Sequence, residues 1–227
     1  MCPRLKLLAL ETSSEYCSAA LLVNGEALQR LERAGQRHSE LLLPMVQGLL
    51  AEAGLPLGAL DALACAVGPG SFTGLRIATA VAQGLAFGAD LPVIPVGTLE
   101  ALAAGAQAPR VIACLDARMG EVYAAAYEMH EGVLPCALQA PRVCAPVALR
   151  LPAGDQWIGC GSGFARHGEA LASVLGALDQ VRPDSVPEAR WVAGLAAARF
   201  AAGERHPPEA LAPVYLRDKV ALTRAER

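Results

Sequence analysis

The segment from residue 63 to 96 constrains the fold more than any other part of the chain, because it contains a strand, a turn, a helix and a second strand in succession. The apolar run Leu63–Val67 is typical of a strand that is covered on both faces of a sheet. It stops at Gly68-Pro69-Gly70, where glycine permits backbone angles that a Cβ atom would block and lets another group come close. A helix over Phe72–Gly88 and a buried strand over Val93–Val96 follow. This unit predicts an α/β fold.

The turn of this unit leaves two interpretations open. Ser71 has the position of a helix N-cap, and the free N–H groups behind it attract phosphate or carboxylate. A phosphate-binding Walker A loop is excluded because Gly74 is followed by Leu75 instead of lysine, and the glycine spacing does not fit the dinucleotide motif either. An ordinary structural turn is the alternative. The anion-facing interpretation assigns Gly70, Ser71, Thr73 and Gly74 to the candidate site.

The composition limits the class of protein to which this chain can belong. With 54% hydrophobic and 18% charged residues, the chain of 227 residues can bury one large core or two small ones. A net charge of −3 argues against a large nucleic-acid surface. No apolar run reaches the roughly 18 residues of a membrane span. Seven cysteines without a CxxC pair indicate a reducing compartment, so we expect a cytoplasmic protein that does not contact a membrane.

The predicted elements divide the chain into two parts that begin with the same order of strands. The first part predicts strands, a helix and then the unit described above, with strands at Leu5–Glu11, Tyr16–Val23 and Ala27–Leu31 and a helix at His38–Ala53. The order β-β-β-α-β-α-β is that of a ribonuclease H-like half-domain, the building block of actin-like ATPases.

The second part begins in the same way after a linking helix at Thr98–Gln107. Its predicted elements are strands at Val111–Asp116, Glu121–Met129 and Trp157–Gly159, helices at Phe164–Leu178 and Glu188–Ala202, and an extended tail at Leu211–Val220 that packs back. We therefore predict an N-terminal half-domain over residues 1–97 and a reduced C-terminal half-domain over residues 98–227.

Several segments together resemble one family. They are ALETSSEYCSAAL (9–21), RHSELLLPMV (37–46), GPGSFTGLRIATAVAQGLAFG (68–88), PVGTLEALA (95–103), LDARMGEVYAA (115–125) and VYLRDKVA (214–221). In this combination the chain resembles the TsaB family, also called YeaZ. The resemblance implies an actin-like fold with a reduced second half. It also implies a subunit of the machinery that places threonylcarbamoyl on the adenosine beside the tRNA anticodon.

The resemblance implies a catalytic paralogue, TsaD. This chain differs from TsaD-like proteins at the metal and nucleotide sites. TsaD-like proteins have a metal-binding HxxxH pair where this chain has Thr98 and Leu102, which cannot hold a catalytic metal. We therefore expect no metal and no catalytic residue. In the wider actin-like class the turn after the first strand approaches phosphates, which adds Thr12 and Ser13 to the anion-facing candidates. Arg118, in the turn of the second hairpin, is a further candidate for an anion or partner contact. No cofactor is expected, and ATP or ADP would bind only where this chain meets TsaD.

The resemblance also implies the partners. The helices over 38–53 and 72–88 are broadly apolar or rich in small residues, which indicates a surface that another subunit covers. The residues assigned to it are Leu41, Leu42, Met45, Leu49, Arg76, Ala80, Gln83 and Phe87. We expect a noncatalytic scaffold that binds and activates TsaD as a heterodimer or pairs with a second copy of itself. A TsaE-type ATPase would join as a third component, and tRNA would be contacted only indirectly. The alternative is a small ATP-dependent enzyme of the actin-like fold or a residual metallopeptidase.

Overall fold

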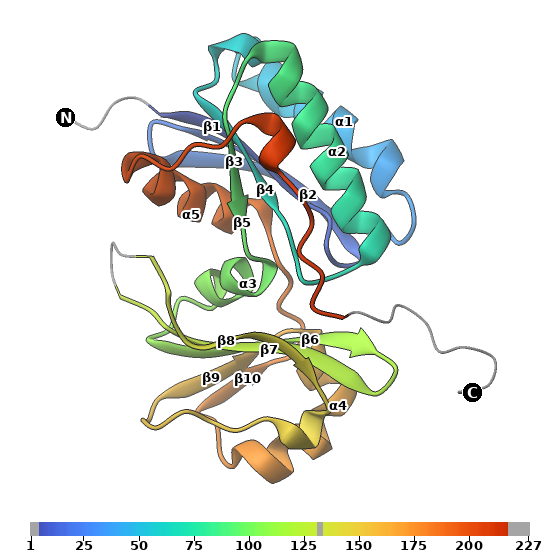
Figure 1. Ribbon diagram of the computed structural model, residues 1–227, viewed down its shortest axis with the longest axis vertical. Coiled ribbons are helices and arrows are strands. Elements are labelled where there is room, and N and C mark those ends of the chain that lie inside the picture. Colours follow the sequence, from blue (N-terminus) through green and yellow to red (C-terminus); the bar gives the residue numbers. More distant parts are fainter. Residues whose placement is uncertain (1–4, 131–133, 218–227) are drawn as a thin grey trace.

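Two five-stranded mixed sheets form the framework, and Figure 1 shows one lobe above the other. The computed structural model describes residues 5–130 and 134–217. In the first sheet, β1 (Lys6–Glu11) is antiparallel to β2 (Tyr16–Val23) and parallel to β4 (Ala62–Ala66). The order is β3-β2-β1-β4-β5, with β3 (Glu26–Arg33) and β5 (Val93–Val96) at the edges.

The second sheet repeats this topology with the order β10-β9-β6-β7-β8. Its strands are β6 (Arg110–Arg118), β7 (Glu121–Glu128), β8 (Cys136–Cys144), β9 (Trp157–Cys160) and β10 (Gln180–Arg182). As in the first sheet, the central strand begins an antiparallel hairpin and has a parallel neighbour on its other side. The two halves of the chain are therefore structural repeats.

The register of the central strands determines which side chains enter the core. Leu8 of β1 lies opposite Leu21 of β2 and beside Leu63 of β4, and all three are fully buried in one cluster. Helices α1 (His38–Glu52) and α2 (Phe72–Ala89) cover this face of the sheet. Each buried leucine side chain stabilises the fold by roughly 1.5–3 kcal/mol.

The last helix of each repeat packs on the sheet of the other repeat. Helix α3 (Thr98–Ala106) follows β5 but packs against β6 and β7, and it lies between the lobes in Figure 1. Helix α5 (Ala189–Ala201) follows β10 but covers the second face of the first sheet. Helix α4 (Ser162–Leu175) covers the outer face of the second sheet. This exchange interlocks the two lobes.

The second repeat is the smaller one. Between β3 and β4 the chain forms α1, whereas between β8 and β9 it forms only the 3-10 turn η2 (Pro146–Ala148). The predicted fold class, an α/β actin-like fold of two repeated halves with the second reduced, is confirmed. The domain limits 1–97 and 98–227 stay a prediction, because α5 and residues 208–217 return to the first lobe.

Most predicted elements are present, with ends that differ by a few residues. The Asn24-Gly25 turn has positive φ at both residues, 56° and 90°, as a two-residue hairpin requires. Strands β8 and β10 were not predicted, because β8 is an exposed edge strand that contains Pro141 and β10 has only three residues. Helix α4 ends before Gly176, not at Leu178. The tail is extended and packs back over residues 211–217, and the remainder of the predicted segment lies outside the described residues.

Two further 3-10 turns complete the fold, η1 (Leu57–Ala59) before β4 and η3 (Pro208–Ala210) beside α2. Among the described residues no helix is both long and apolar enough to cross a lipid bilayer.

Candidate functional site

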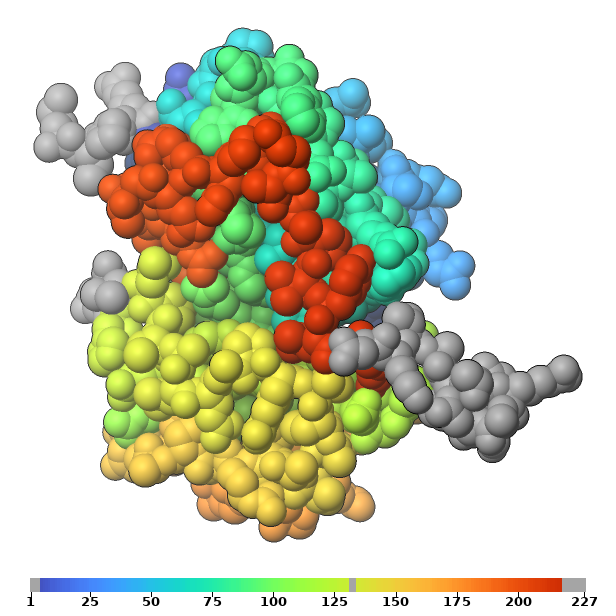
Figure 2. Space-filling view, viewed as in Figure 1, coloured from blue at the N-terminus to red at the C-terminus, as the bar shows by residue number. Residues whose placement is uncertain are grey.

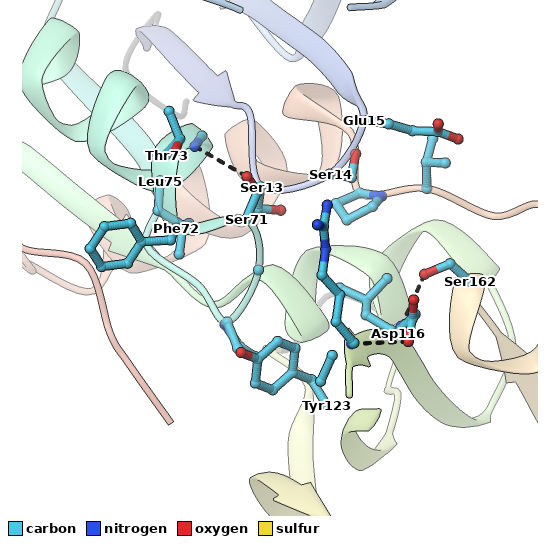
Figure 3. A pocket seen from close by; sticks show the side chains of 18 of the residues that line it. Ser13, Ser14, Glu15, Ser71, Phe72, Thr73, Leu75, Asp116, Tyr123 and Ser162 are labelled. Carbon is cyan, nitrogen blue, oxygen red and sulfur yellow. Dashed lines mark hydrogen bonds between the residues drawn. The ribbon is translucent and has the colours of Figure 1, made fainter. Parts of the chain in front are cut away.

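A cavity of about 1110 Å³ lies between the two lobes (Figure 3). Corresponding elements of the two repeats line it: the β1–β2 and β6–β7 turns and the starts of α2 and α4. Ser71 of the first lobe and Asp116 and Ser162 of the second face the same space. Further walls are formed by residues 35, 36 and 38 at the start of α1, Tyr123 of β7, residues 185–187 before α5 and residues 214–217 of the tail. The cavity is therefore formed by both lobes together.

The glycines of the turn after β4 are required by the packing of the chain itself. Ser71 N donates a hydrogen bond to Ser13 O over 2.7 Å, and Thr12 Oγ1 donates to Gly74 O over 2.7 Å. A Cβ atom on Gly70 would lie 2.5 Å from Ser13 O, and one on Gly74 would overlap the Thr12 carbonyl. The β1–β2 turn is thus what comes close to these two glycines. An ordinary structural turn therefore explains why glycine stands at positions 70 and 74.

The start of α2 has the predicted cap. Ser71 Oγ accepts a hydrogen bond from Gly74 N over 3.3 Å, and the side chains of Ser71 and Thr73 are exposed at the cavity. Six of the seven predicted anion-facing residues line the cavity, namely Ser13, Gly70, Ser71, Thr73, Gly74 and Arg118. Thr12 is fully buried and its hydroxyl is used on Gly74, so the structure does not place it at the cavity. Binding of an anion here stays a prediction.

Two arginines give the cavity a cationic rim. Arg118 lies in the β6–β7 turn with a φ of 60°, and Arg166 lies in the second turn of α4; both are exposed, and neither side chain forms an ion pair among the described residues. Sequence analysis missed Arg166, although α4 repeats α2 and its first turns therefore face the same cavity. Asp116 Oδ1 accepts from Arg118 N over 3.0 Å and lies 3.3 Å from His167 Nε2. These contacts hold the turn that carries Arg118.

Glu11 lies beneath the β1–β2 turn and does not line the cavity. Its carboxyl is fully buried, and Oε1 accepts a hydrogen bond from Ser13 N over 2.7 Å, whereas Oε2 has no hydrogen-bond partner among the residues that the structure describes. Burial raises the pKa of the Glu11 carboxyl to about 7. Because the carboxyl does not reach the cavity, its contact with Ser13 shapes the turn rather than acting on a bound molecule.

The positions that correspond to the metal-binding pair of TsaD begin α3. Thr98 and Leu102 are buried one helical turn apart, and Thr98 N donates to Gly68 O over 2.8 Å. Within residues 5–130 and 134–217, no three His, Cys, Asp or Glu side chains gather closely enough to hold a metal ion. The Cys65 and Cys160 thiols are buried, and burial raises their pKa to about 12.

The predicted partner-binding residues separate into two groups. Leu42, Met45 and Leu49 lie in the core under α1, so their assignment to the surface was wrong. They recur at i, i+3 and i+7 and form the stripe that faces the sheet. Leu41 and Gln83 are half-buried. The three exposed residues of the prediction are all on α2, namely Arg76, Ala80 and Phe87.

The exposed sides of α1 and α2 form a nearly uncharged surface, which we call the helical face. It consists of Leu43, Pro44, Gln47, Gly48 and Ala51 on α1 and Phe72, Arg76, Ala80, Gly84, Phe87 and Gly88 on α2. Leu43 is 42% exposed and Phe87 is 63% exposed. Leu43 was not among the residues assigned to the partner surface, although its position opposite the buried stripe exposes it. Exposed glycine and alanine allow another helix to approach closely, and the three large apolar side chains, Leu43, Phe72 and Phe87, favour burial.

Comparison with known proteins connects this architecture to one family. Residues 32–148 match the family model "TsaD: tRNA N6-adenosine threonylcarbamoyltransferase". The chain is 39% identical to the tRNA threonylcarbamoyladenosine biosynthesis protein TsaB of Haemophilus influenzae, with 95% of each chain covered. It is 37% identical to the Escherichia coli protein of the same name, with 96% of each covered.

Solved structures agree. YeaZ from Pseudomonas aeruginosa superposes with a TM-score of 0.88 at 40% identity, covering 93% of this chain and all of that chain. A second structure from Pseudomonas aeruginosa, described as similar to peptidase YEAZ, has the same TM-score at 41% identity and covers 94% of this chain. The repeated sheets, the reduced second half and these near full-length matches lead to one conclusion: the chain belongs to the TsaB (YeaZ) family of tRNA threonylcarbamoyladenosine biosynthesis proteins.

Proposed function

We propose that this chain is a noncatalytic subunit that binds TsaD and activates it for threonylcarbamoyl transfer to the adenosine beside the tRNA anticodon. The observation that carries the proposal is the helical face. From residue 72 to 89, Arg76 is the only charged residue of α2, and the charged residues of α1 lie near its ends at Glu40 and Glu52. Exposed apolar surfaces with few charged residues are typical of subunit contacts.

The positions where catalytic groups were sought support an accessory role. The buried acid Glu11 does not reach the cavity, and Thr98 and Leu102 have no group that a catalytic metal prefers. The chemistry would therefore belong to TsaD, and this chain would contribute by stabilising the active arrangement of its partner. A TsaE-type ATPase would join the pair, and a role in tRNA modification agrees with a cytoplasmic location.

Reconstitution tests the proposal. Purified TsaD and TsaE, with tRNA, ATP and a threonylcarbamoyl donor, should modify the tRNA much faster when this chain is added. Equal rates with and without the chain would contradict the proposed role. ATP hydrolysis by the isolated chain at a rate that accounts for the reaction would favour the alternative of a small ATP-dependent enzyme.

A charge placed on the helical face tests the surface itself. Ala80→Glu buries an unpaired carboxylate in the proposed contact, so we expect the Kd for TsaD to rise at least a hundredfold and tRNA modification to fall with it. Ala172→Glu, on the exposed side of α4 in the other lobe, makes the same substitution away from this face. It should leave the Kd within about twofold, and equal weakening by both variants would remove the helical face as the docking surface.

A further inference from the structure

Residues 211–217, which we call the C-terminal strap, connect the helical face to the second lobe. The strap is the red segment that runs down beside α2 in Figure 1, and Figure 2 shows it at the surface where it reaches the lower lobe. Residues 214–217 also form one wall of the cavity. The strap therefore touches both the proposed docking surface and the space between the lobes.

The first half of the strap is fixed to the first lobe. Leu211 is buried, and its carbonyl accepts a hydrogen bond from Gln83 Nε2 of α2 over 2.9 Å. Val214 N donates to Val67 O over 2.7 Å. A Cβ atom on Gly68 would lie 2.7 Å from Val214 O, so the φ of +116° and the missing side chain of this glycine accommodate the strap.

Tyr215 joins the strap to the helical face. Arg76 Nε donates to Tyr215 Oη over 2.9 Å, and the Arg76 guanidinium carbon lies 3.8 Å from the centre of the Phe72 ring. The rings of Phe72 and Tyr215 are 5.3 Å apart between centroids. Phe72 and Arg76 belong to the helical face, so a subunit that covers this end of α2 also covers Tyr215.

Arg217 joins the strap to the second lobe. Its guanidinium forms an ion pair with Glu121 at the start of β7 and donates to Arg118 O over 3.4 Å. Only 15% of the Arg217 side chain is exposed, so solvent screens this pair less than a surface pair. Glu121 and Arg118 flank the β6–β7 turn, which carries part of the cationic rim of the cavity.

We propose that the strap couples binding of TsaD on the helical face to the position of the β6–β7 turn at the cavity. The inference rests on the proposed function. Subunit contacts on Phe72, Arg76 and Tyr215 hold the strap in place, and the strap holds Arg217 against Glu121. Coupling is reciprocal, so loss of the Arg217–Glu121 pair at the far end lowers the affinity for TsaD. The strap would then occupy its docking position in a smaller fraction of the molecules, and the apparent Kd would rise in inverse proportion to that fraction.

The experiment combines titration calorimetry with hydrogen exchange on the full chain. Arg217→Gln and Glu121→Gln, which we call the latch variants, should each raise the Kd for TsaD about fivefold, the lower end of common couplings. The double variant should be no weaker than the single ones. Arg142→Gln, which removes an exposed cation on β8 of the same lobe, should leave the Kd unchanged. TsaD should also slow amide exchange over residues 115–121 in the wild-type chain and less so in the two latch variants.

The outcomes separate the two proposals. If the wild-type chain binds TsaD and both latch variants bind equally well, or if TsaD leaves exchange over residues 115–121 unchanged, the coupling is wrong and the proposed function stands. If the wild-type chain does not bind TsaD, the proposed function is wrong and the coupling fails with it. Circular dichroism of both latch variants shows that each is folded, and Glu121→Gln serves as the second route if Arg217→Gln is not.

Discussion

Glu11 at the end of β1 has a fully buried carboxyl that forms no ion pair within the described part of the chain. Burial raises its pKa from 4.5 to about 7, so the folded chain binds this proton more tightly than the unfolded chain. The contribution to stability is therefore complete below pH 4.5, decreases as the pH rises to about 7, and is lost above it. The loss amounts to about 3 kcal/mol.

A glutamine at this position removes the titration and keeps the shape. From pH 5 to pH 8 the free energy of unfolding of Glu11→Gln should gain about 2.5 kcal/mol relative to that of the wild-type chain, because part of the total loss occurs below pH 5. Urea denaturation at several pH values measures this difference. Glu40→Gln changes an exposed glutamate of α1 and should follow the wild-type profile. A constant difference between Glu11→Gln and the wild-type chain across this range would show that the buried carboxyl does not titrate there.

Single residues also show how far sequence reasoning reaches. The pattern at residues 68–74 correctly indicated a close approach to glycine and an N-cap at Ser71. It could not tell which group approaches, because the neighbours of Gly70 and Gly74 are 57 or more residues away in the chain, at Ser13 and Thr12. The same holds for Gly68, whose neighbour Val214 lies in the strap.

At the scale of elements, the two faces of α1 give adjacent leucines different roles. Leu42 is fully buried against the sheet, whereas Leu43 is 42% exposed on the helical face. Leu42→Ala should lower the free energy of unfolding by about 2–5 kcal/mol, because it leaves a cavity in the core. Leu43→Ala should change it by less than about 0.5 kcal/mol while weakening TsaD binding about tenfold or more. Urea denaturation and titration calorimetry on both variants check the pair, and a destabilised Leu43→Ala with unchanged affinity would reverse the assignment.

Element patterns predicted this fold better than they predicted its surface. Helical spacing located α1 and α2, but the same spacing identifies the buried stripe, so three of the residues assigned to the partner surface proved to be core. Strand β8 escaped prediction because an edge strand with Pro141 lacks both a continuous apolar run and strict alternation. Which apolar face stays uncovered follows from tertiary packing and not from periodicity.

At the scale of the whole molecule, the exchange of α3 and α5 bears on whether the two lobes unfold separately. Helix α5 buries Val192, Ala193 and Ala196 against the first sheet, although the chain reaches it only after completing the second. The ion pair between Arg199 of α5 and Glu100 of α3, 2.6 Å long and largely buried, links the two exchanged helices. A fragment that ends at residue 97 lacks α5 and would expose this face of its sheet.

We therefore expect one cooperative unfolding transition for the full chain. The two tryptophans provide separate probes, because Trp157 lies in the core of the second lobe and Trp191 lies on α5 of the first. In Trp191→Phe only Trp157 reports, and in Trp157→Phe only Trp191 reports. Fluorescence and circular dichroism should give coincident urea midpoints within each variant, since both probes follow the same event. If fluorescence and circular dichroism separate in either variant, the lobes unfold independently, and the boundary between residues 97 and 98 divides the chain energetically despite the exchanged helices.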